Sequence, residues 1–313
     1  MIAQASDAGS RLDQVLTRRL TGRSRALIQK HIEAGAVFVN GARPKQGSKT
    51  KVRTGDRIDY VPPAPPPSNV TAEDIPLRIL LEDDEILVLD KPKNLIVHPS
   101  STRREGTLVA AVLHHLKREA SANPRAGIVH RLDKDTTGVM IVAKTPFAED
   151  KLAAAFRNRA VEKAYVAVVH GRPAPDDGTI ETLFGRHPRA RKRFSSRVEA
   201  GKVAITHYAT AERFIGASLM HIRLETGRTH QIRVHFSDRG HPLIGDPVYG
   251  RRRRSQDPRV GAILNAFDRP ALHARQLVFP HPSTGKSITV EAPLPSDLCT
   301  LIDQLRAWPA LTP

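Results

Sequence analysis

The sequence predicts an α+β protein of two domains, a small N-terminal α/β domain and a larger one built on a mixed, largely antiparallel sheet with flanking helices. The chain has 313 residues, of which 40% are hydrophobic, enough for about two domains with packed cores. Its segment VPPAPPPSN, 61–69, holds five prolines, which favour an extended spacer. Beyond this spacer, helical and strand patterns follow one another without regular alternation, which favours α+β over a parallel sheet.

We therefore place the small domain at residues 1–61, the proline-rich linker at 62–74 and the larger domain at 75–313. The first helix is predicted over RLDQVLTRRL, 11–20, because its apolar residues share one helical face. Ser24 is a suitable N-cap for a second helix that ends at Gly35. FVNG, 38–41, predicts a strand that enters a turn, and TGDRIDYV, 54–61, predicts a turn and the closing strand.

The larger domain is predicted to contain several apolar strands and helices in irregular order. Strands are expected over 85–92, 139–145, 161–171 and 217–227, and helices over 107–120 and 146–159. A further helix is expected to start near Thr229, with Ile232 and Phe236 on its apolar side. His230 and Arg233 are three residues apart, so on such a helix they share a face.

The charge balance points to a polyanionic partner. The formal net charge is +17 and the pI is about 10.5, which favour nucleic acid or an anionic surface as the partner. No apolar run is long enough to span a membrane, and the start of the sequence lacks the apolar stretch of a secretory signal, so we expect a cytoplasmic protein. The single cysteine, Cys299, excludes an intrachain disulfide and a cysteine-based metal cage.

Basic residues are concentrated in three regions. The first 68 residues hold twelve Lys/Arg and five Asp/Glu, RHPRARKRFSSR at 186–197 holds six Arg/Lys, and RRRR occupies 251–254. Each region alone is typical of a solvated surface, whereas three together favour a track for a phosphate backbone. The phosphate-loop, dinucleotide, zincin and zinc-deaminase motifs are missing, so we expect neither a metal nor a cofactor.

Two polar clusters are candidates for chemistry. In HRLDKDTTG, 130–138, Asp133 lies in a polar turn between apolar segments, where it either faces a site or only hydrogen-bonds the turn backbone. In the second cluster, 224–250, Arg233 either pairs with a carboxylate from another segment or belongs to an exposed basic helix. Composition and spacing leave both choices open.

Long motifs in these clusters resemble the pseudouridine synthases that act on ribosomal RNA. HRLDKDTTG resembles the signature of that family, KAYVAVVHG, 163–171, its tyrosine motif, and LETGRTHQIRVH with GHPLIGDPVYG its arginine motif. PRAGIVHRLDKDTTG, GKVAITHY and FDRPALHA are similar to the D-type subgroup of the large-subunit enzymes. RLDQVL, SRALIQKHIEAGAVFVNG and TGDRID resemble the small RNA-binding domain named after the fourth small-subunit ribosomal protein. The resemblance covers roughly residues 10–307, with Thr137 where many members carry serine.

The resemblance implies a role for individual residues. Asp133 is expected to be the catalytic carboxylate, Arg233 its partner, and Tyr165 the aromatic that packs on the target base. Arg131 is expected to enter the space that the flipped uridine leaves. Other expected RNA contacts are His130, Arg11, Arg23, Arg25, Arg228 and His230. The implied partner is large-subunit ribosomal RNA, free or in a precursor particle, and the implied enzyme is a monomer without a cofactor.

The chemistry of such a reaction fits these residue types. Uridine becomes pseudouridine when the base leaves the ribose at nitrogen 1 and returns through carbon 5, so no redox cofactor is needed. An ionised aspartate is required, and a paired arginine offsets the rise in its pKa that burial would cause. Whether Asp133 attacks the sugar, attacks the ring or removes a sugar proton stays open.

Two other functions remain as alternatives. A non-catalytic RNA-binding or ribosome-assembly protein on the same fold would need the same basic regions. A glycosidase acting on the sugar–base bond would need two carboxylates ~5–9.5 Å apart. Asp133 and Asp135, two residues apart in a turn, are poorly placed to form that pair.

Overall fold

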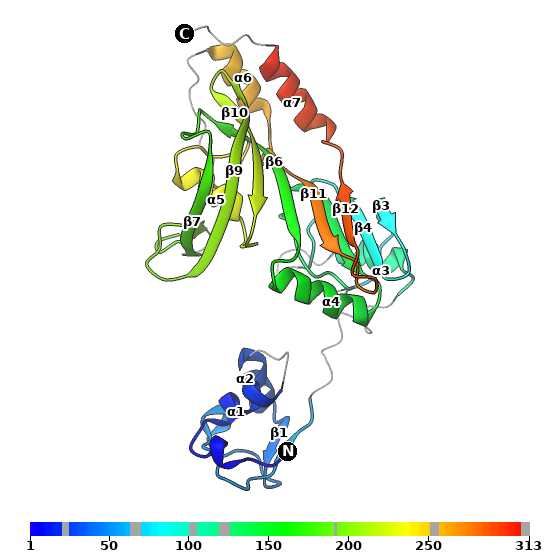
Figure 1. The fold of residues 1–313 in the computed structure, drawn as a ribbon, viewed down its shortest axis with the longest axis vertical. Helices are drawn as coiled ribbons and strands as arrows, with labels where there is room; N and C mark the ends of the chain where they lie inside the picture. Colours follow the sequence, from blue (N-terminus) through cyan, green and yellow to red (C-terminus); the bar gives the residue numbers. More distant parts are fainter. Residues whose placement is uncertain are drawn as a thin grey trace. The chain divides into compact units, whose positions relative to one another are not determined.

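A computed structural model of the chain describes residues 1–20, 25–62, 70–99, 105–118, 126–190, 193–250 and 257–307. The chain divides into two compact units, Met1–Ser68 and Asn69–Pro313, each described here by itself (Figure 1). The predicted linker lies mostly outside the described residues. Within the described residues, no helix is long and apolar enough to cross a membrane.

The first unit packs two helices against a two-stranded antiparallel sheet. Its elements are η1 (Ala5–Asp7), α1 (Leu12–Arg19), α2 (Arg25–Glu33), β1 (Val37–Val39), η2 (Gly47–Lys49) and β2 (Ile58–Tyr60). The apolar face predicted for the first helix is confirmed, since Leu12, Val15 and Leu16 are fully buried with Ile28 of α2. Gly35 follows α2 with a φ of +79°, the left-handed geometry in which glycine ends helices. The N-cap predicted at Ser24 lies outside the described residues.

The second unit is built on one large sheet. Its strands are β3 (Arg78–Glu82), β4 (Ile86–Lys91), β5 (Thr137–Ala143), β6 (Glu162–His170), β7 (Asp177–Arg186), β8 (Phe194–Ser195), β9 (Lys202–Phe214), β10 (Ala217–Leu224), β11 (Leu272–Pro280) and β12 (Ser287–Glu291). Their order in the sheet is β3-β4-β5-β11-β6-β10-β9-β7-β8, and β12 pairs with β11. Among the described strands, β5 and β11 form the one parallel pair. The predicted α+β class with a largely antiparallel sheet is therefore confirmed.

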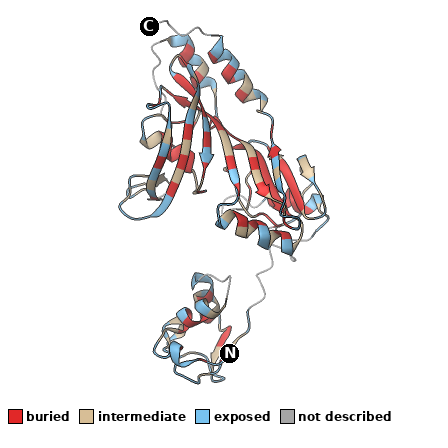
Figure 2. Cartoon of the chain, viewed as in Figure 1, coloured by how far each residue is buried: buried red, intermediate tan, exposed pale blue. Residues whose placement is uncertain are grey.

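Helices cover both faces of this sheet. They are α3 (Leu108–His115), α4 (Pro146–Arg157), α5 (Gln231–Asp238), α6 (Pro258–Ala266) and α7 (Ser296–Arg306). β4 and β5 are buried on both faces of the sheet (Figure 2). One face of both strands packs against α3 and the other face against α4, which explains why the two strands are continuous apolar runs in the sequence. Pro146 occupies the first turn of α4, as expected, and the Thr145 hydroxyl caps that helix.

The polar turn predicted at 130–138 lies in a longer loop, and the strand predicted at 139–145 starts two residues earlier, at Thr137 of β5. The segment 126–136 forms a loop, of which Ile128 makes only an isolated bridge to Val142 of β5. The start of the helix near Thr229 is also shifted, because α5 begins at Gln231 and His230 is its N-cap. These two loops, one before β5 and one before α5, both border the pocket described next.

Candidate active site

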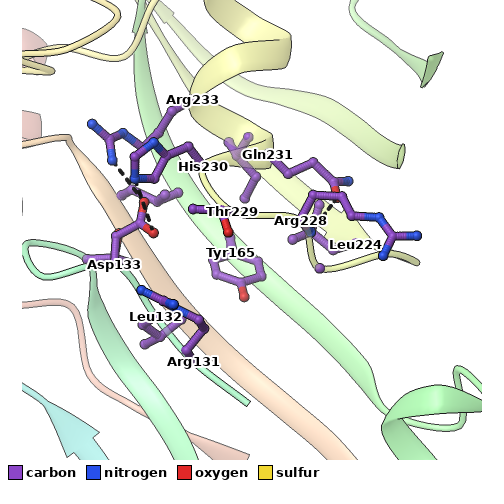
Figure 3. Close-up of a pocket in the computed structure, with 14 residues that line it drawn as sticks. Arg131, Leu132, Asp133, Tyr165, Leu224, Arg228, Thr229, His230, Gln231 and Arg233 are labelled. Carbon is purple, nitrogen blue, oxygen red and sulfur yellow. Dashed lines mark hydrogen bonds and ion pairs between the residues drawn. The ribbon is translucent and has the colours of Figure 1, made fainter. Parts of the chain in front are cut away.

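A pocket in the second unit is lined mainly by three parts of the sequence, with Leu272 of β11 as a further lining residue (Figure 3). The loop before β5 contributes Arg131, Leu132 and Asp133, and strand β6 contributes Tyr165. The third part is the connection between β10 and α5 together with the first turn of that helix, 227–233. The fold therefore brings the two polar clusters of the sequence, about one hundred residues apart, to one place.

The loop that carries Asp133 is fixed from behind by backbone geometry. β5 starts directly after it and lies parallel to β11 with Thr137 opposite His273. Gly138 has a φ of +114°, and a Cβ at this position would lie 2.1 Å from the Ala274 carbonyl oxygen. Glycine is therefore required at this point, because the two backbones approach too closely for any side chain.

Two buried basic side chains also hold this loop through its carbonyl groups. Lys91, at the end of β4, is fully buried, and its Nζ donates to the carbonyls of Pro92, Leu95 and Lys134 at 2.8–2.9 Å. Arg269 donates to the Asp135 carbonyl at 3.2 Å while its Nε and Nη2 bind the carboxylate of Asp297. The backbone around Asp133 is thus held by hydrogen bonds from Lys91 and Arg269.

Arg233 connects Asp133 to a second carboxylate. Its Nε and Nη2 bind Asp246 at 2.7 and 2.9 Å, while its Nη1 donates to Asp133 Oδ2 at 2.9 Å. The Asp246 side chain is fully buried, whereas that of Asp133 is 18% exposed. Asp246 therefore fixes the guanidinium plane, and Asp133 is the carboxylate of this trio that faces the pocket.

The pKa values of Arg233 and Asp246 are both shifted toward their charged forms. Burial alone would lower the pKa of Arg233. The hydrogen bonds and charge of Asp246 outweigh this effect, together with the charge of Asp133, and raise that pKa. Burial likewise opposes ionisation of Asp246, yet the bonds from Arg233 and from the Val248 and Tyr249 amides hold its pKa below the ordinary value. The arrangement is a preformed anionic site with one arginine shared by two aspartates.

Tyr165 provides an aromatic surface in the same pocket. It projects from β6 between two apolar clusters and is partly buried. Burial, and secondarily the negative charge of Asp133, raises the pKa of the Tyr165 hydroxyl. The ring therefore stays neutral near pH 7 and can pack against a planar base.

Of the four other residues predicted in this unit, Arg131, Arg228 and His230 line the pocket and His130 does not. Arg131 is exposed, lines the pocket and has no acidic partner among the described residues. Arg228 also lines it, but its guanidinium is bound to the Val203 carbonyl and points away from Asp133 (Figure 3). His130 is not among the lining residues: its Nε2 accepts the Ile141 amide, and its ring stacks on Phe156 at 4.7 Å.

His130 therefore does not contribute to this pocket, and its predicted contact with RNA stays a prediction. Burial, and then the charge of Lys163, lowers the pKa of His130 to about 3, so the ring is neutral and accepts a backbone hydrogen bond. Its place between β5 and α4 is that of a packing residue. The sequence could not distinguish the two roles, because His130 directly precedes the exposed Arg131 in the same motif.

In the first unit, two of the predicted arginines converge on a buried aspartate. Arg11 and Arg25 both bind Asp13, whose side chain is fully buried and also accepts from Gln29. Although burial opposes it, these bonds lower the pKa of Asp13 to about 2. The side chains of Arg11 and Arg25 remain 29% and 48% exposed, so each keeps a solvent-facing edge. Arg23 and the RRRR run lie outside the described residues.

Sequence reasoning missed four residues that organise the pocket: Lys91, Asp246, Tyr249 and Arg269. Lys91 had a signal, because a lysine at the end of an otherwise apolar strand is unusual unless its charge is compensated. Asp246 and Tyr249 lay within the second polar cluster, but nothing in their spacing identified their partners. Their roles depend on contacts between segments distant in sequence, which only the fold reveals.

Comparison with known proteins gives consistent matches over both units. A family model described as RNA pseudouridylate synthase matches residues 85–238, and one described as S4 domain matches residues 10–58. "Ribosomal large subunit pseudouridine synthase D" of Nitrosomonas europaea is 45% identical over 303 residues, 96% of this chain and 86% of that protein. The protein of the same name from Pseudomonas aeruginosa is 44% identical, covering 95% of this chain and 92% of that protein.

Solved structures share the fold of the second unit. Human RNA pseudouridylate synthase domain containing 1 is 27% identical, with a TM-score of 0.56 over 75% of this chain and 96% of that chain. Human RNA pseudouridylate synthase domain containing 4, at 24% identity, has a TM-score of 0.59 over 73% of this chain and 93% of that one. The expected small RNA-binding domain and the expected synthase fold are both confirmed.

Proposed function

Because this chain belongs to the RNA pseudouridylate synthase family, we propose that it converts uridines of large-subunit ribosomal RNA to pseudouridine, with Asp133 as the catalytic carboxylate. The observation that carries the proposal is the trio of Asp133, Arg233 and Asp246. It presents one partly exposed carboxylate in a pocket whose buried arginine is already oriented by another acid. Such preorganisation is what a carboxylate needs when it must stay ionised beside an apolar base.

The remaining pocket residues suit a flipped uridine. The target base must leave its stack, which costs a few kcal/mol. The partly buried ring of Tyr165 offers a flat contact for it, and the exposed Arg131 is placed beside Asp133 to fill the vacated space. The reaction is a redox-neutral isomerisation, so the proposal needs no cofactor, and a carboxylate at this position serves each of the three chemical routes.

The choice of substrate rests on the relatives and on charge. The compared bacterial relatives are named for the large ribosomal subunit, and each matches more than nine tenths of this chain. The net charge of +17 favours a polyphosphate partner. We propose that the enzyme works as a cytoplasmic monomer on this RNA, either free or in a precursor particle.

The test is tritium release from RNA labelled at carbon 5 of uridine, because the new bond to ribose forms at that carbon and its hydrogen must leave. Wild type should release tritium and Asp133→Asn should not, while both bind RNA. Asp135→Asn is a matched control, since Asp135 lies in the same loop but does not line the pocket. Near-normal turnover by Asp133→Asn would refute the assignment.

The same assay separates the alternative functions. Release of free uracil instead of tritium would indicate a glycosidase, and tight binding without any release would indicate a non-catalytic RNA-binding protein. Comparison of naked ribosomal RNA with large-subunit particles would identify the preferred substrate form.

A role for the first unit is tested by its removal. We expect a chain that lacks residues 1–68 to keep the pocket but to bind RNA more weakly, with a shallower dependence on salt because phosphate contacts are lost. An unchanged affinity and an unchanged pattern of modified sites would contradict this role.

A further inference from the structure

His230 and Tyr249 form a second set of contacts around Asp133. The Nε2 of His230 lies 3.8 Å from Asp133 Oδ1, the carboxylate oxygen that Arg233 does not bind. On the other side of the same ring, Nδ1 lies 3.0 Å from the Tyr249 hydroxyl. Tyr249 is buried, and its own ring lies against the Arg233 guanidinium. His230 thus faces the oxygen of Asp133 that Arg233 leaves unbound, and Tyr249 contacts both His230 and Arg233.

The hydrogen bonds of Tyr249 favour one position of the proton on His230. The Tyr249 oxygen accepts the backbone amide of Phe194 at 3.0 Å, so its single hydrogen is free to point at His230 Nδ1. A neutral imidazole that accepts at Nδ1 carries its proton on Nε2. Burial lowers the pKa of His230, against the pull of Asp133, which is consistent with a neutral ring. The Nε2–H group then faces Asp133 Oδ1.

The backbone at His230 is held in an unusual conformation. Its φ is +62°, in the left-handed region, which is unfavourable for a non-glycine residue and persists only where surrounding contacts impose it. The ring is fixed by edge-on contacts with Phe194 and Tyr249, at 5.9 and 5.5 Å between centroids. The Gln231 side chain accepts the Arg228 amide and so ties down the turn before His230. The strain therefore has an identifiable result, the placement of this imidazole beside Asp133.

We propose that His230, held in its Nε2–H form by Tyr249, is a positioning residue for Asp133, an inference that rests on the proposed function. A separation of 3.8 Å is too long for a hydrogen bond, and catalytic hydrogen bonds commonly shorten when substrate fills the site. When the uridine occupies the pocket, His230 Nε2–H closes on Oδ1 while Arg233 holds Oδ2. The two donors together fix the plane of the carboxylate against the base.

The first test compares substitutions at His230 by tritium-release kinetics on one ribosomal RNA substrate. His230→Ala should lower kcat roughly 10- to 100-fold, the equivalent of one hydrogen bond to a charged group, with KM for RNA nearly unchanged. His230→Gln, whose amide can reach the place of Nε2–H, should recover most of that loss. His230→Asn tolerates the left-handed backbone but is too short, so it should not recover activity. Equal activity of the Ala and Gln variants would overturn the proposal.

The second test is a double-mutant cycle with Tyr249→Phe, which keeps the ring beside Arg233 and removes the hydroxyl. Alone it should lower kcat several-fold, because the proton of His230 is no longer directed to Nε2. In the His230→Gln background it should cost little more, since an amide has no tautomer to select. If Tyr249→Phe costs the same factor in both backgrounds, the hydroxyl only supports the Phe194 amide and the proposed pair does not exist.

Controls separate this inference from the proposed function. His221→Gln, an exposed histidine of β10 outside this pocket, should behave as wild type. If wild type releases tritium, Asp133→Asn does not and His230→Ala turns over normally, only the positioning role fails. If wild type itself releases none, the proposed function fails and the inference with it. Circular dichroism of each variant identifies loss of activity that is due to misfolding.

Discussion

Replacement of Lys91 by methionine should change how stability depends on pH. Lys91 is fully buried, and three carbonyl groups surround its Nζ, one of them Lys134 in the loop that carries Asp133. Burial lowers the pKa of Lys91 from 10.5 to about 7, although Asp135 and Asp133 favour the charged form. Methionine has a similar length and no charge, so the variant removes this titration with little change in volume.

The sign and size of the effect follow from proton binding. Between pH 7 and pH 10 the unfolded chain keeps a proton on Lys91 that the folded chain has released, so wild-type stability gains from this residue as the pH rises. Each pH unit across that window is worth about 1.4 kcal/mol, and the full window about 4 kcal/mol. Titrations of all other groups cancel in the difference between wild type and Lys91→Met.

The assay is urea unfolding of both proteins at several pH values between 7 and 10, followed by circular dichroism. The difference in unfolding free energy should grow with pH in favour of wild type. Already at pH 7 the variant should have the lower unfolding free energy, because three carbonyl groups lose their donor. Each carbonyl group that is left unsatisfied costs ~1–3 kcal/mol. A difference that is constant with pH would refute the reasoning, since it would show that the carbonyl cage keeps Lys91 charged in the folded state.

Three other variants test the surrounding framework. Asp246→Ala leaves the buried Arg233 with one acidic partner and should cost ~3–5 kcal/mol of stability together with most of the tritium release, measured by urea unfolding and the RNA assay. Gly138→Ala places a methyl group against the Ala274 carbonyl and should lower stability by more than about 1 kcal/mol; an unchanged melting curve would contradict the close approach. Asp13→Asn should remove a contribution to stability that depends on acid. Because its pKa is lowered, Asp13 stabilises the first unit above pH 4 and loses this effect as the pH falls toward 2. The unfolding free energies of wild type and variant should therefore converge near pH 2.

Much of the fold was accessible from sequence because local patterns dominate it. The faces of α1 and α5, the doubly buried strands β4 and β5, and the proline at the start of α4 are all set by short-range periodicity. The parallel pairing of β5 with β11 was not accessible, because strands separated by more than one hundred residues leave no shared local signal. Long-range pairing is determined by the packing of the whole sheet.

The candidate site, like the fold, could be predicted from sequence only in part. Asp133 and Arg233 could be selected from sequence because each lies in a long polar motif, and the resemblance supplied the expectation that they meet. Which other groups they bind was not predictable, and His130 illustrates why: its neighbour Arg131 lines the pocket while its own ring packs on Phe156. In an irregular loop, adjacent side chains point in directions that neither helical nor strand periodicity specifies.

The contacts around Asp133 bind the backbone of its loop and one of its two carboxylate oxygens. Lys91 and Arg269 bind carbonyl groups of the loop, so they fix the backbone without contacting the carboxylate itself. Arg233 binds one carboxylate oxygen, Oδ2, and is itself fixed by Asp246. Among the described residues, no donor lies within hydrogen-bond distance of the other oxygen, Oδ1, and His230 Nε2 lies 3.8 Å from it. The framework thus fixes Asp133 through its backbone and through Oδ2, and leaves Oδ1 facing His230, the residue that we propose binds this oxygen when the uridine enters.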